Sequence, residues 1–206
     1  MVKHNLHLDG SDTHIGASSI ASRVAELGEY FTNKFAGKEV IAITMMNGAK
    51  VFGTDLTRAI NNVNLLDDNM RVSSYQGTES LGKVHFTYDI YLDLKGKDVL
   101  LIEDILDTGT TLSQVIPELW ARKPKSITLA CMFEKPSKRK PGTDFHVDDI
   151  QIGMHIADKF ILGYGLDWKD PNGISRYRNL PYVTIAKIVQ RQGIEWIEPL
   201  DVPTIS

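Results

Sequence analysis

Apolar residues recur along the chain in two patterns, one helical and one extended. Between Ser18 and Phe35 they fall at three- and four-residue spacings, which predicts an amphipathic helix closed by Gly37. Further helices are expected over 51–60 and 111–120. Short apolar runs lie between and after the helices and predict buried strands: Glu39–Met45, Val99–Ile102, Ser126–Phe133, Lys159–Tyr164 and Tyr182–Ile188. Strands alternating with helices indicate an α/β domain on a mostly parallel sheet.

Three segments depart from this alternation. Arg71–Tyr75 and Val84–Leu94 are expected to form extended arms around the polar, glycine-containing stretch SSYQGTESLG, which we expect to be a mobile loop. The basic run EKPSKRKPG, residues 134–142, is expected to be a loop after a strand. The segment Gln190–Ser206 is expected to be irregular, either packed as a cap or partly disordered.

Composition narrows the class of protein. The chain has 206 residues, which suits a single domain, 1–206. Its formal charge of −3 argues against a dedicated nucleic-acid binder, although a local field could still attract a small phosphate ester. The N-terminus has no secretory signal, and no run approaches the roughly 18 apolar residues that cross a bilayer. The single cysteine, Cys131, is expected to be a core thiol, so a cytoplasmic protein is predicted.

The stretch VLLIEDILDTGTTL, residues 99–112, concentrates the candidate chemistry. Glu103 and Asp104 follow a buried run, and ligands bind beyond the carboxyl ends of strands in open parallel sheets. Adjacent acids there could accept hydrogen bonds from two vicinal hydroxyls or hold a hydrated magnesium ion. The Asp107–Thr111 segment that follows offers backbone N–H groups, a glycine and three hydroxyls at a helix N-terminus, which suits a phosphate dianion. Together they describe a site for a ribose 5-phosphate.

A simpler interpretation exists for each of these residues. Asp107 could be a turn residue, Thr110 or Thr111 could cap the helix, and Glu103 and Asp104 could be solvated. The whole constellation after one clean strand favours the ligand site.

VLLIEDILDTGTTL resembles the phosphoribosyl-pyrophosphate signature of type I phosphoribosyltransferases. Three further segments are similar to the hypoxanthine (hypoxanthine-guanine) phosphoribosyltransferases: SSYQGTESLG, FEKPSKRK, and DKFILGYGLDW with RYRNLPY. The resemblance covers roughly 40–188. It implies a core of parallel strands flanked by helices, about 38–165, and a small hood from about 1–16 and 166–206. It also implies transfer of a 5-phosphoribosyl group from phosphoribosyl pyrophosphate to N9 of a 6-oxopurine, with Mg²⁺, giving IMP or GMP and pyrophosphate.

The resemblance also implies roles for individual residues. Asp107 would be the general base or acid near N7 of the purine, and Glu103 and Asp104 would contact the ribose hydroxyls and the metal ion, with Asp167 as a further metal ligand. The 5-phosphate would be bound by Thr108, Gly109, Thr110 and Thr111, and the pyrophosphate by Asn47, Gly48 and Arg178. Ser74 and Tyr75 would belong to a loop that closes over the site. The purine would be bound by Lys135, Phe160, Ile161 and Asp167. A core phenylalanine and a solvated lysine are the simpler interpretations of Phe160 and Lys135.

Two segments depart from the family pattern. Met46-Asn47-Gly48-Ala49 stands where relatives commonly have Leu-Lys-Gly-Gly, so a basic side chain is lost at Asn47, and Lys50 is a candidate replacement. Relatives can hold a non-proline cis peptide in this loop, and the sequence leaves its presence open. The connection WKDPNGIS, 168–175, is longer than usual, which makes the placement of Arg178 less certain.

Three alternatives remain open from the sequence. A regulator that senses phosphoribosyl pyrophosphate and binds RNA or DNA would use the basic run KPSKRK, although intact purine contacts favour an enzyme without a nucleic-acid partner. A transferase that prefers xanthine is a second alternative. A metal site from N-terminal histidines and aspartates, His4, His7, His14, Asp9 and Asp12, fits no standard ligand spacing. The family suggests a homodimer or homotetramer, but no interface stripe is identifiable.

Overall fold

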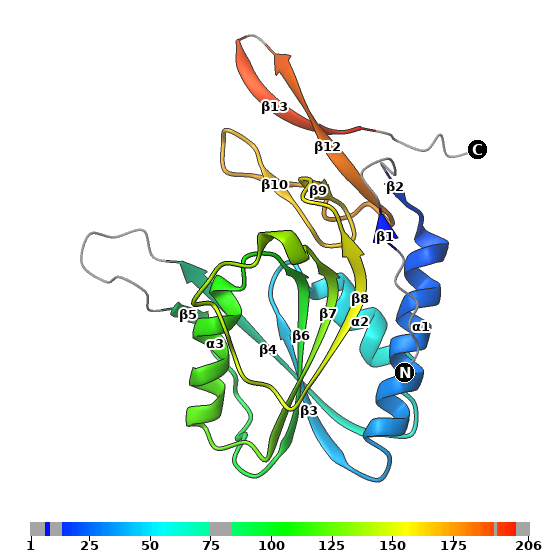
Figure 1. Cartoon of the computed structure of the whole chain (residues 1–206), viewed down its shortest axis with the longest axis vertical. Coiled ribbons are helices and arrows are strands. Elements are labelled where there is room, and N and C mark those ends of the chain that lie inside the picture. Colours follow the sequence, from blue (N-terminus) through cyan, green and yellow to red (C-terminus); the bar gives the residue numbers. More distant parts are fainter. Residues whose placement is uncertain (1–6, 9–13, 75–83, 192, 201–206) are drawn as a thin grey trace.

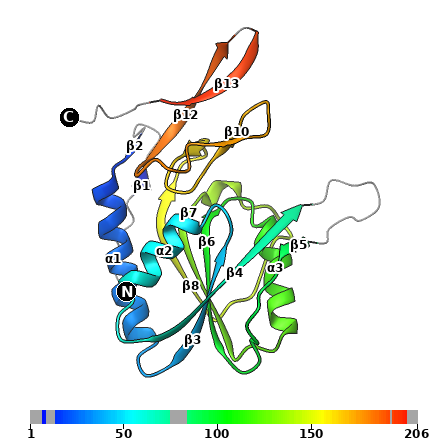
Figure 2. The same cartoon turned by 180° about the vertical axis from the view of Figure 1, so that it is seen from behind.

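A seven-stranded sheet with helices on both faces forms most of the molecule (Figures 1 and 2). The computed structural model describes residues 7–8, 14–74, 84–191 and 193–200. The strand order is β1-β8-β7-β6-β3-β4-β5, and every neighbouring pair is parallel except β4 with β5. The strands are β1 (His7–Leu8), β3 (Glu39–Met45), β4 (Asn64–Ser74), β5 (Val84–Tyr88), β6 (Asp98–Leu106), β7 (Ser126–Glu134) and β8 (Asp149–Ile156). The predicted α/β class with a mostly parallel sheet is confirmed.

The central strands are apolar along their whole length because both faces of the sheet are covered. Helices α1 (Ala17–Lys34) and α2 (Lys50–Ala59) pack on one face, where Phe31 and Phe52 are fully buried. Helix α3 (Thr110–Ala121) covers the other face, over Leu101 and its neighbours. Cys131 is fully buried on β7, as expected of a core thiol.

A second, smaller sheet lies beyond the carboxyl ends of the main strands (Figure 1). Its strands are β2 (His14–Ile15), β9 (Ile161–Leu162), β12 (Val183–Arg191) and β13 (Ile194–Pro199), and each of the other three pairs with β12 in the antiparallel sense. A separate hairpin of β10 (Trp168–Lys169) and β11 (Ser175–Arg176) occupies the long connection seen in the sequence. Segments from both ends of the chain therefore meet in one sheet.

The structure corrects several sequence-based boundaries. The segment after Gln190 was expected to be irregular, but β13 pairs with the second half of β12 as a hairpin. The extended arms differ as well: the first begins at Asn64, and the second is a strand only over Val84–Tyr88. Strand β8, Asp149–Ile156, was not predicted, because its sequence DIQIGMHI mixes polar with apolar residues as an outer strand does. The expected strand Lys159–Tyr164 is reduced to two residues, Ile161–Leu162.

Within the described ranges, no helix combines the length and apolar character needed to cross a membrane.

Candidate active site

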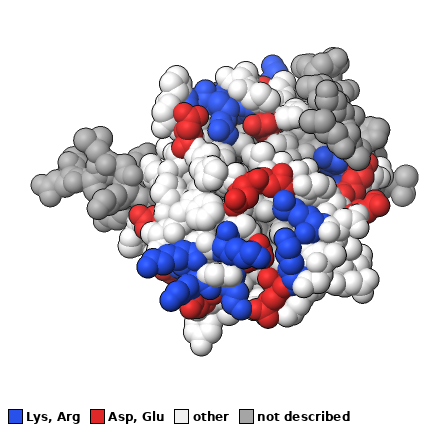
Figure 3. All heavy atoms as spheres, turned by 60° about the horizontal axis from the view of Figure 1, so that its bottom comes forward, with Lys and Arg blue, Asp and Glu red and all other residues white. Residues whose placement is uncertain are grey.

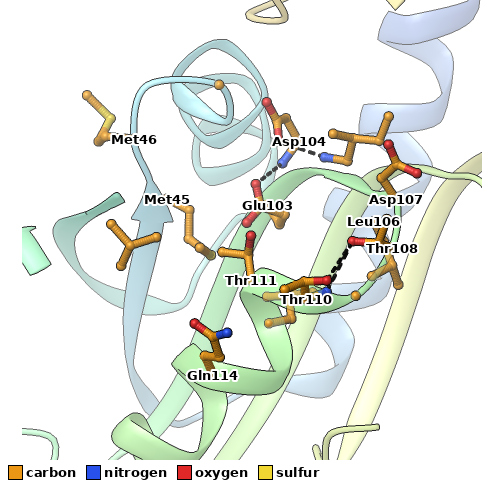
Figure 4. Close-up of a pocket in the computed structure, with 15 residues that line it drawn as sticks. Met45, Met46, Glu103, Asp104, Leu106, Asp107, Thr108, Thr110, Thr111 and Gln114 are labelled. Atoms are coloured by element: carbon orange, nitrogen blue, oxygen red, sulfur yellow. Dashed lines mark hydrogen bonds between the residues drawn. The ribbon is translucent and has the colours of Figure 1, made fainter. Parts of the chain in front are cut away.

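A cavity of about 400 Å³ opens at the carboxyl end of the central strand β6 (Figure 4). It is lined by the whole turn from Glu103 to Leu112, together with Met45, Met46 and Gly48 after β3, Val72 of β4, and Gln114 of α3. The central position of β6 in the sheet brings loops from both neighbouring strands around this turn. The seven candidate residues from Glu103 to Thr111 that the sequence singled out all lie on this one cavity.

Glu103 and Asp104 supply two neighbouring carboxyl groups to the cavity. Glu103 is 9% exposed, and burial together with the neighbouring Asp104 carboxylate raises its pKa well above the usual range. Its Oε1 accepts the backbone N–H of Asp104 at 3.1 Å, and Oδ1 of Asp104 accepts that of Ile105 at 2.7 Å. With Glu103 buried and Asp104 half-buried, the acidic pair is stabilised by hydroxyl donors or by a cation, so both candidate roles from the sequence suit it.

The turn after β6 presents backbone amides to the cavity. Gly109 precedes α3 with φ +83° and has no side chain to cap the helix. The first-turn N–H groups lack partners within the helix, and that of Thr110 donates to the Thr108 hydroxyl at 3.3 Å. The Thr108 and Thr110 hydroxyls lie 2.9 Å apart across the turn (Figure 4). These groups, with the positive end of the helix dipole, make a site for a phosphate.

Thr143 supports this turn and was missed in the sequence. The Thr143 hydroxyl donates to the carbonyl of Thr108 at 2.9 Å. A Cβ built on Gly109 would lie 2.8 Å from the oxygen of this Thr143 hydroxyl. Glycine is therefore required at 109 both by its φ and by Thr143. The residue follows the basic run and carries no motif of its own, so no local pattern could have indicated it.

Asp107 and Lys135 meet at the edge of the cavity. Lys135 follows β7 and is only 6% exposed, with its Nζ 3.7 Å from Oδ2 of Asp107. The other carboxylate oxygen, Oδ1, is buried without a hydrogen-bond partner among the described residues. The structure thus brings together an acceptor and a buried ammonium, which the sequence had placed 28 positions apart.

The candidates after β8 lie outside the cavity lining. Phe160 is 49% exposed, and Ile161 belongs to β9, paired with Ile185. Asp167 and Arg178 form an ion pair at 2.7 Å, and the Arg178 guanidinium also donates to the carbonyl of Gly165. Asp167 is therefore next to Arg178 rather than next to Glu103 and Asp104.

The loop between β3 and α2 contains a cis peptide bond between Met46 and Asn47. Met46 and Gly48 line the cavity, whereas the exposed Asn47 does not. Lys50, the candidate replacement for a basic residue at 47, lines a second cavity of about 280 Å³ with Asp67 and Asn69 of β4.

Two expected features lie partly outside the described residues. Ser74 is the last residue of β4, and Tyr75 of the expected closing loop lies outside the described residues. The same holds for His4, Asp9 and Asp12 of the N-terminal metal alternative. In the part of the chain that the structure describes, no three His, Cys, Asp or Glu side chains converge as metal ligands.

The donor set is nevertheless suitable for magnesium. Mg²⁺ prefers oxygen ligands and usually takes one or two carboxylates, completing its shell with water and substrate phosphates. Glu103 and Asp104 provide two such carboxylates beside a phosphate-type turn. Asp167 does not add a third ligand to this pair in the structure.

Comparison with known proteins agrees with the geometry. The model of the phosphoribosyl transferase domain matches residues 16–169. The hypoxanthine-guanine phosphoribosyltransferase of Staphylococcus aureus strain Mu50 is 36% identical over 183 residues, which cover 88% of this chain and 97% of the relative. A crystal structure of a hypoxanthine phosphoribosyltransferase from S. aureus has a TM-score of 0.75 at 36% identity, covering 86% of this chain and 91% of that one.

A second solved structure supports the same assignment. The hypoxanthine-guanine phosphoribosyltransferase of Bacillus anthracis, with a HEPES molecule in its active site, has a TM-score of 0.73 at 35% identity, covering 85% of this chain and 98% of that one. The resemblance seen in the sequence motifs is thereby confirmed. The chain belongs to the hypoxanthine-guanine phosphoribosyltransferases, within the phosphoribosyl transferase domain family.

Proposed function

We propose that this purine salvage transferase moves the 5-phosphoribosyl group of phosphoribosyl pyrophosphate to N9 of hypoxanthine, and of guanine, releasing pyrophosphate and giving IMP or GMP. One observation carries the proposal: the Glu103–Asp104 pair, with Glu103 buried, shares one cavity with the N-terminus of α3. Carboxylates can accept hydrogen bonds from the ribose hydroxyls, and backbone amides at a helix N-terminus can bind the 5-phosphate.

The phosphoribosyl half of the substrate would lie along β6 and its turn. Glu103 and Asp104 accept hydrogen bonds from the two ribose hydroxyls, while the amides and hydroxyls from Thr108 to Thr111 hold the 5-phosphate. Magnesium bound at the acidic pair would neutralise the departing pyrophosphate and orient it. Glu103 is buried and Asp104 is half-buried, so carboxylates held ionised here by a cation would act on the ribose in a low-dielectric site as positive charge develops at the anomeric carbon.

Asp107 would accept the proton that the purine loses. Its Oδ1 is buried without a partner among the described residues, so it can accept a proton from N7 of the incoming base. Deprotonation makes the purine a better nucleophile at N9. The nearby Lys135 ammonium keeps a positive charge 3.7 Å from the other oxygen.

Lys135 would also select the base. An ammonium directed at the exocyclic O6 favours an oxo group and opposes the amino group of adenine, since two donors would then face each other. The half-exposed ring of Phe160 is available to stack on the purine, with the backbone of Ile161 and the carboxylate of Asp167 at the base edge. Asp167 is also a candidate metal ligand, and its partner Arg178 a candidate pyrophosphate ligand.

The remaining features complete the proposal. The second sheet with the β10–β11 hairpin would form the hood, and Ser74 and Tyr75 would close over the reacting centre and exclude water. Asn47 and Gly48 would offer backbone groups to pyrophosphate. A cytoplasmic location and a homodimer or homotetramer are further parts of the proposal that follow from the family.

A regulator that binds RNA or DNA is the second candidate function, and the structure gives it little support. Lys138 of the basic run pairs with Asp158 at 3.1 Å, and Arg139 lies over the ring of Phe145. At the amino ends of the strands, Lys and Arg are interspersed with Asp and Glu (Figure 3), including the pairs Lys97–Glu39 and Lys125–Asp98. Among the described residues of these two surfaces, acidic or aromatic partners accompany these basic side chains, which does not favour binding of a phosphate backbone.

The decisive experiment mixes the protein with phosphoribosyl pyrophosphate, magnesium and one purine base, and measures release of pyrophosphate. We expect release with hypoxanthine and with guanine, and much less with adenine. Comparison of kcat/KM for hypoxanthine, guanine and xanthine then ranks the 6-oxopurines and tests the xanthine alternative. No release with any base, together with salt-sensitive RNA binding, would instead favour the regulator.

A further inference from the structure

Three segments that are distant in the sequence touch one another beside the cavity through two glycines. A Cβ built on Gly48 would lie 1.7 Å from Oδ2 of Asp104. A Cβ built on Gly165, after β9, would lie 2.1 Å from the carbonyl oxygen of Gly48. Gly165 therefore packs directly against Gly48, and Gly48 against Asp104. Neither glycine position has room for a Cβ atom in this arrangement.

Gly165 is fixed on the side of the stack away from the cavity. Its N–H donates to the carbonyl of Arg178 at 3.0 Å, and its own carbonyl accepts from the Arg178 guanidinium. The preceding residue, Tyr164, is buried, and its hydroxyl donates to Oδ2 of Asp55 on α2 at 2.8 Å. The φ of Gly165 is +96°, a conformation that favours glycine.

We propose that Gly165 is a positioning residue for the pyrophosphate half of the site. Because Gly165 has no side chain, its Cα can pack against the Gly48 carbonyl while its backbone bonds to Arg178. This contact positions the 46–49 loop against the Asp104 carboxylate. The proposal rests on the function proposed above. It adds a residue whose substitution should weaken the use of phosphoribosyl pyrophosphate and spare the purine contacts.

The geometry explains why the effect should be selective. Gly48 and Asp104 line the cavity assigned to the sugar and its phosphates. The candidate purine residue Lys135 is not among the residues that line this cavity, and its ion-pair partner Asp107 is. A side chain at 165 would push the Gly48 carbonyl and leave the Lys135–Asp107 pair in place.

Two other glycines of the same region provide matched controls. Gly163 has φ +99°, and a Cβ there would lie 2.0 Å from the carbonyl of Tyr182, so the strain and the clash are similar but fall within the second sheet. Gly173 has φ +77° with open space around it, so it tests the backbone strain alone. A merely structural role would make Gly165→Ala behave as Gly163→Ala does.

The experiment compares Gly165→Ala, Gly163→Ala and Gly173→Ala for kcat, for KM of each substrate and for Tm. We expect Gly165→Ala alone to raise KM for phosphoribosyl pyrophosphate roughly ten- to a hundredfold, with KM for hypoxanthine within about twofold. Equal changes in both KM values, or the same pattern in Gly163→Ala, would overturn the proposal.

Two further measurements keep the test informative. If Gly165→Ala does not fold, Tyr164→Phe removes the bond to Asp55 without a clash and should raise KM for phosphoribosyl pyrophosphate a few-fold; an unchanged value would count against the proposal. Titration of pyrophosphate with magnesium into each folded variant measures binding without turnover. If the wild-type protein transfers no phosphoribosyl group but binds pyrophosphate, and Gly165→Ala weakens that binding, the proposed function fails while the positioning role stands.

Discussion

The Nζ of Lys135 lies 3.7 Å from Oδ2 of Asp107, and this contact joins a candidate purine residue to the turn after β6. Lys135 comes from the end of β7 and Asp107 from the turn after β6, so the parallel pairing of these strands places them side by side. In the proposed function, the Asp107 carboxylate accepts the purine proton and the neighbouring Lys135 ammonium contacts the exocyclic oxygen of the purine.

Asp107→Asn should lower kcat by about 10²- to 10⁴-fold, the range typical of a lost general acid or base. The amide keeps the size of the carboxyl group, so KM for phosphoribosyl pyrophosphate should change little. Steady-state kinetics with hypoxanthine provides the measurement, and Asp93→Asn, an exposed aspartate elsewhere, is the control. Near-normal turnover in Asp107→Asn would rule out the proton-transfer role.

Lys135→Ala should reduce the preference for 6-oxopurines over adenine roughly ten- to a hundredfold, which corresponds to the loss of one charged hydrogen bond. The ratio of kcat/KM values for hypoxanthine and adenine measures this preference. Lys138→Ala is the matched control, because Lys138 lies in the same loop but pairs with Asp158. The assignment of Lys135 to the purine oxygen would be wrong if the ranking of bases stayed the same.

Asn47→Lys should lower KM for phosphoribosyl pyrophosphate about two- to fivefold, because it returns a positive charge to the loop after β3 at an exposed position. The gain should shrink as salt concentration rises. Asn61→Lys places the same charge beyond the opposite end of α2 and should have no effect. Equal kinetics for the two variants would show that residue 47 is too far from the pyrophosphate to act on it.

Gly28→Ala should destabilise the protein by about 1 to 3 kcal/mol, the usual cost of overpacking. A Cβ at this position of α1 would lie 2.6 Å from Cβ of Ala59 and 2.7 Å from its carbonyl oxygen, on α2. The clash outweighs the gain in helix propensity of about 1 kcal/mol. Chemical denaturation measures the free energy of unfolding, and Glu29→Ala, exposed on the same helix, is the control. A Gly28→Ala variant as stable as wild type would mean that the helices can separate without cost.

Asp170→Asn should destabilise the protein at neutral pH and lose this effect in acid. Burial alone would raise the pKa of Asp170, but the N–H groups of Ile174 and Asn172 and the Arg176 guanidinium lower it below the usual range. A lowered pKa in the folded state means that the stabilisation is present above about pH 4 and is lost as the pH falls through the folded value. Thermal unfolding of both proteins from pH 7 to pH 3 should show the two Tm values converging, and a constant difference would exclude the charge as its source.

The sequence predicted the central strands and the turn after β6 because their patterns are local. Apolar runs such as Val99–Ile102 and the turn from Asp107 to Thr111 carry their information within a few residues, and the structure has both in the expected places. Helices α1, α2 and α3 were also found within two residues of their bounds. Local patterns suffice where one segment carries both the structure and the chemistry.

The parts that were missed depend on contacts between distant segments. Strand β13 forms because β12 offers it an edge, and nothing in its own sequence requires a strand. Thr143 acts on Thr108, and Gly165 meets Gly48, across more than thirty and more than a hundred positions. The ion pair between Asp167 and Arg178 was equally invisible, because the long β10–β11 hairpin separates its partners.

Strand β12 pairs with β2 from the start of the chain and with β9 beside Phe160. During synthesis the main sheet can assemble as soon as β8 has left the ribosome, whereas β2 and β9 must wait for β12 to arrive. The segment that holds Phe160 and Ile161 therefore takes its final place only after β12 has been made.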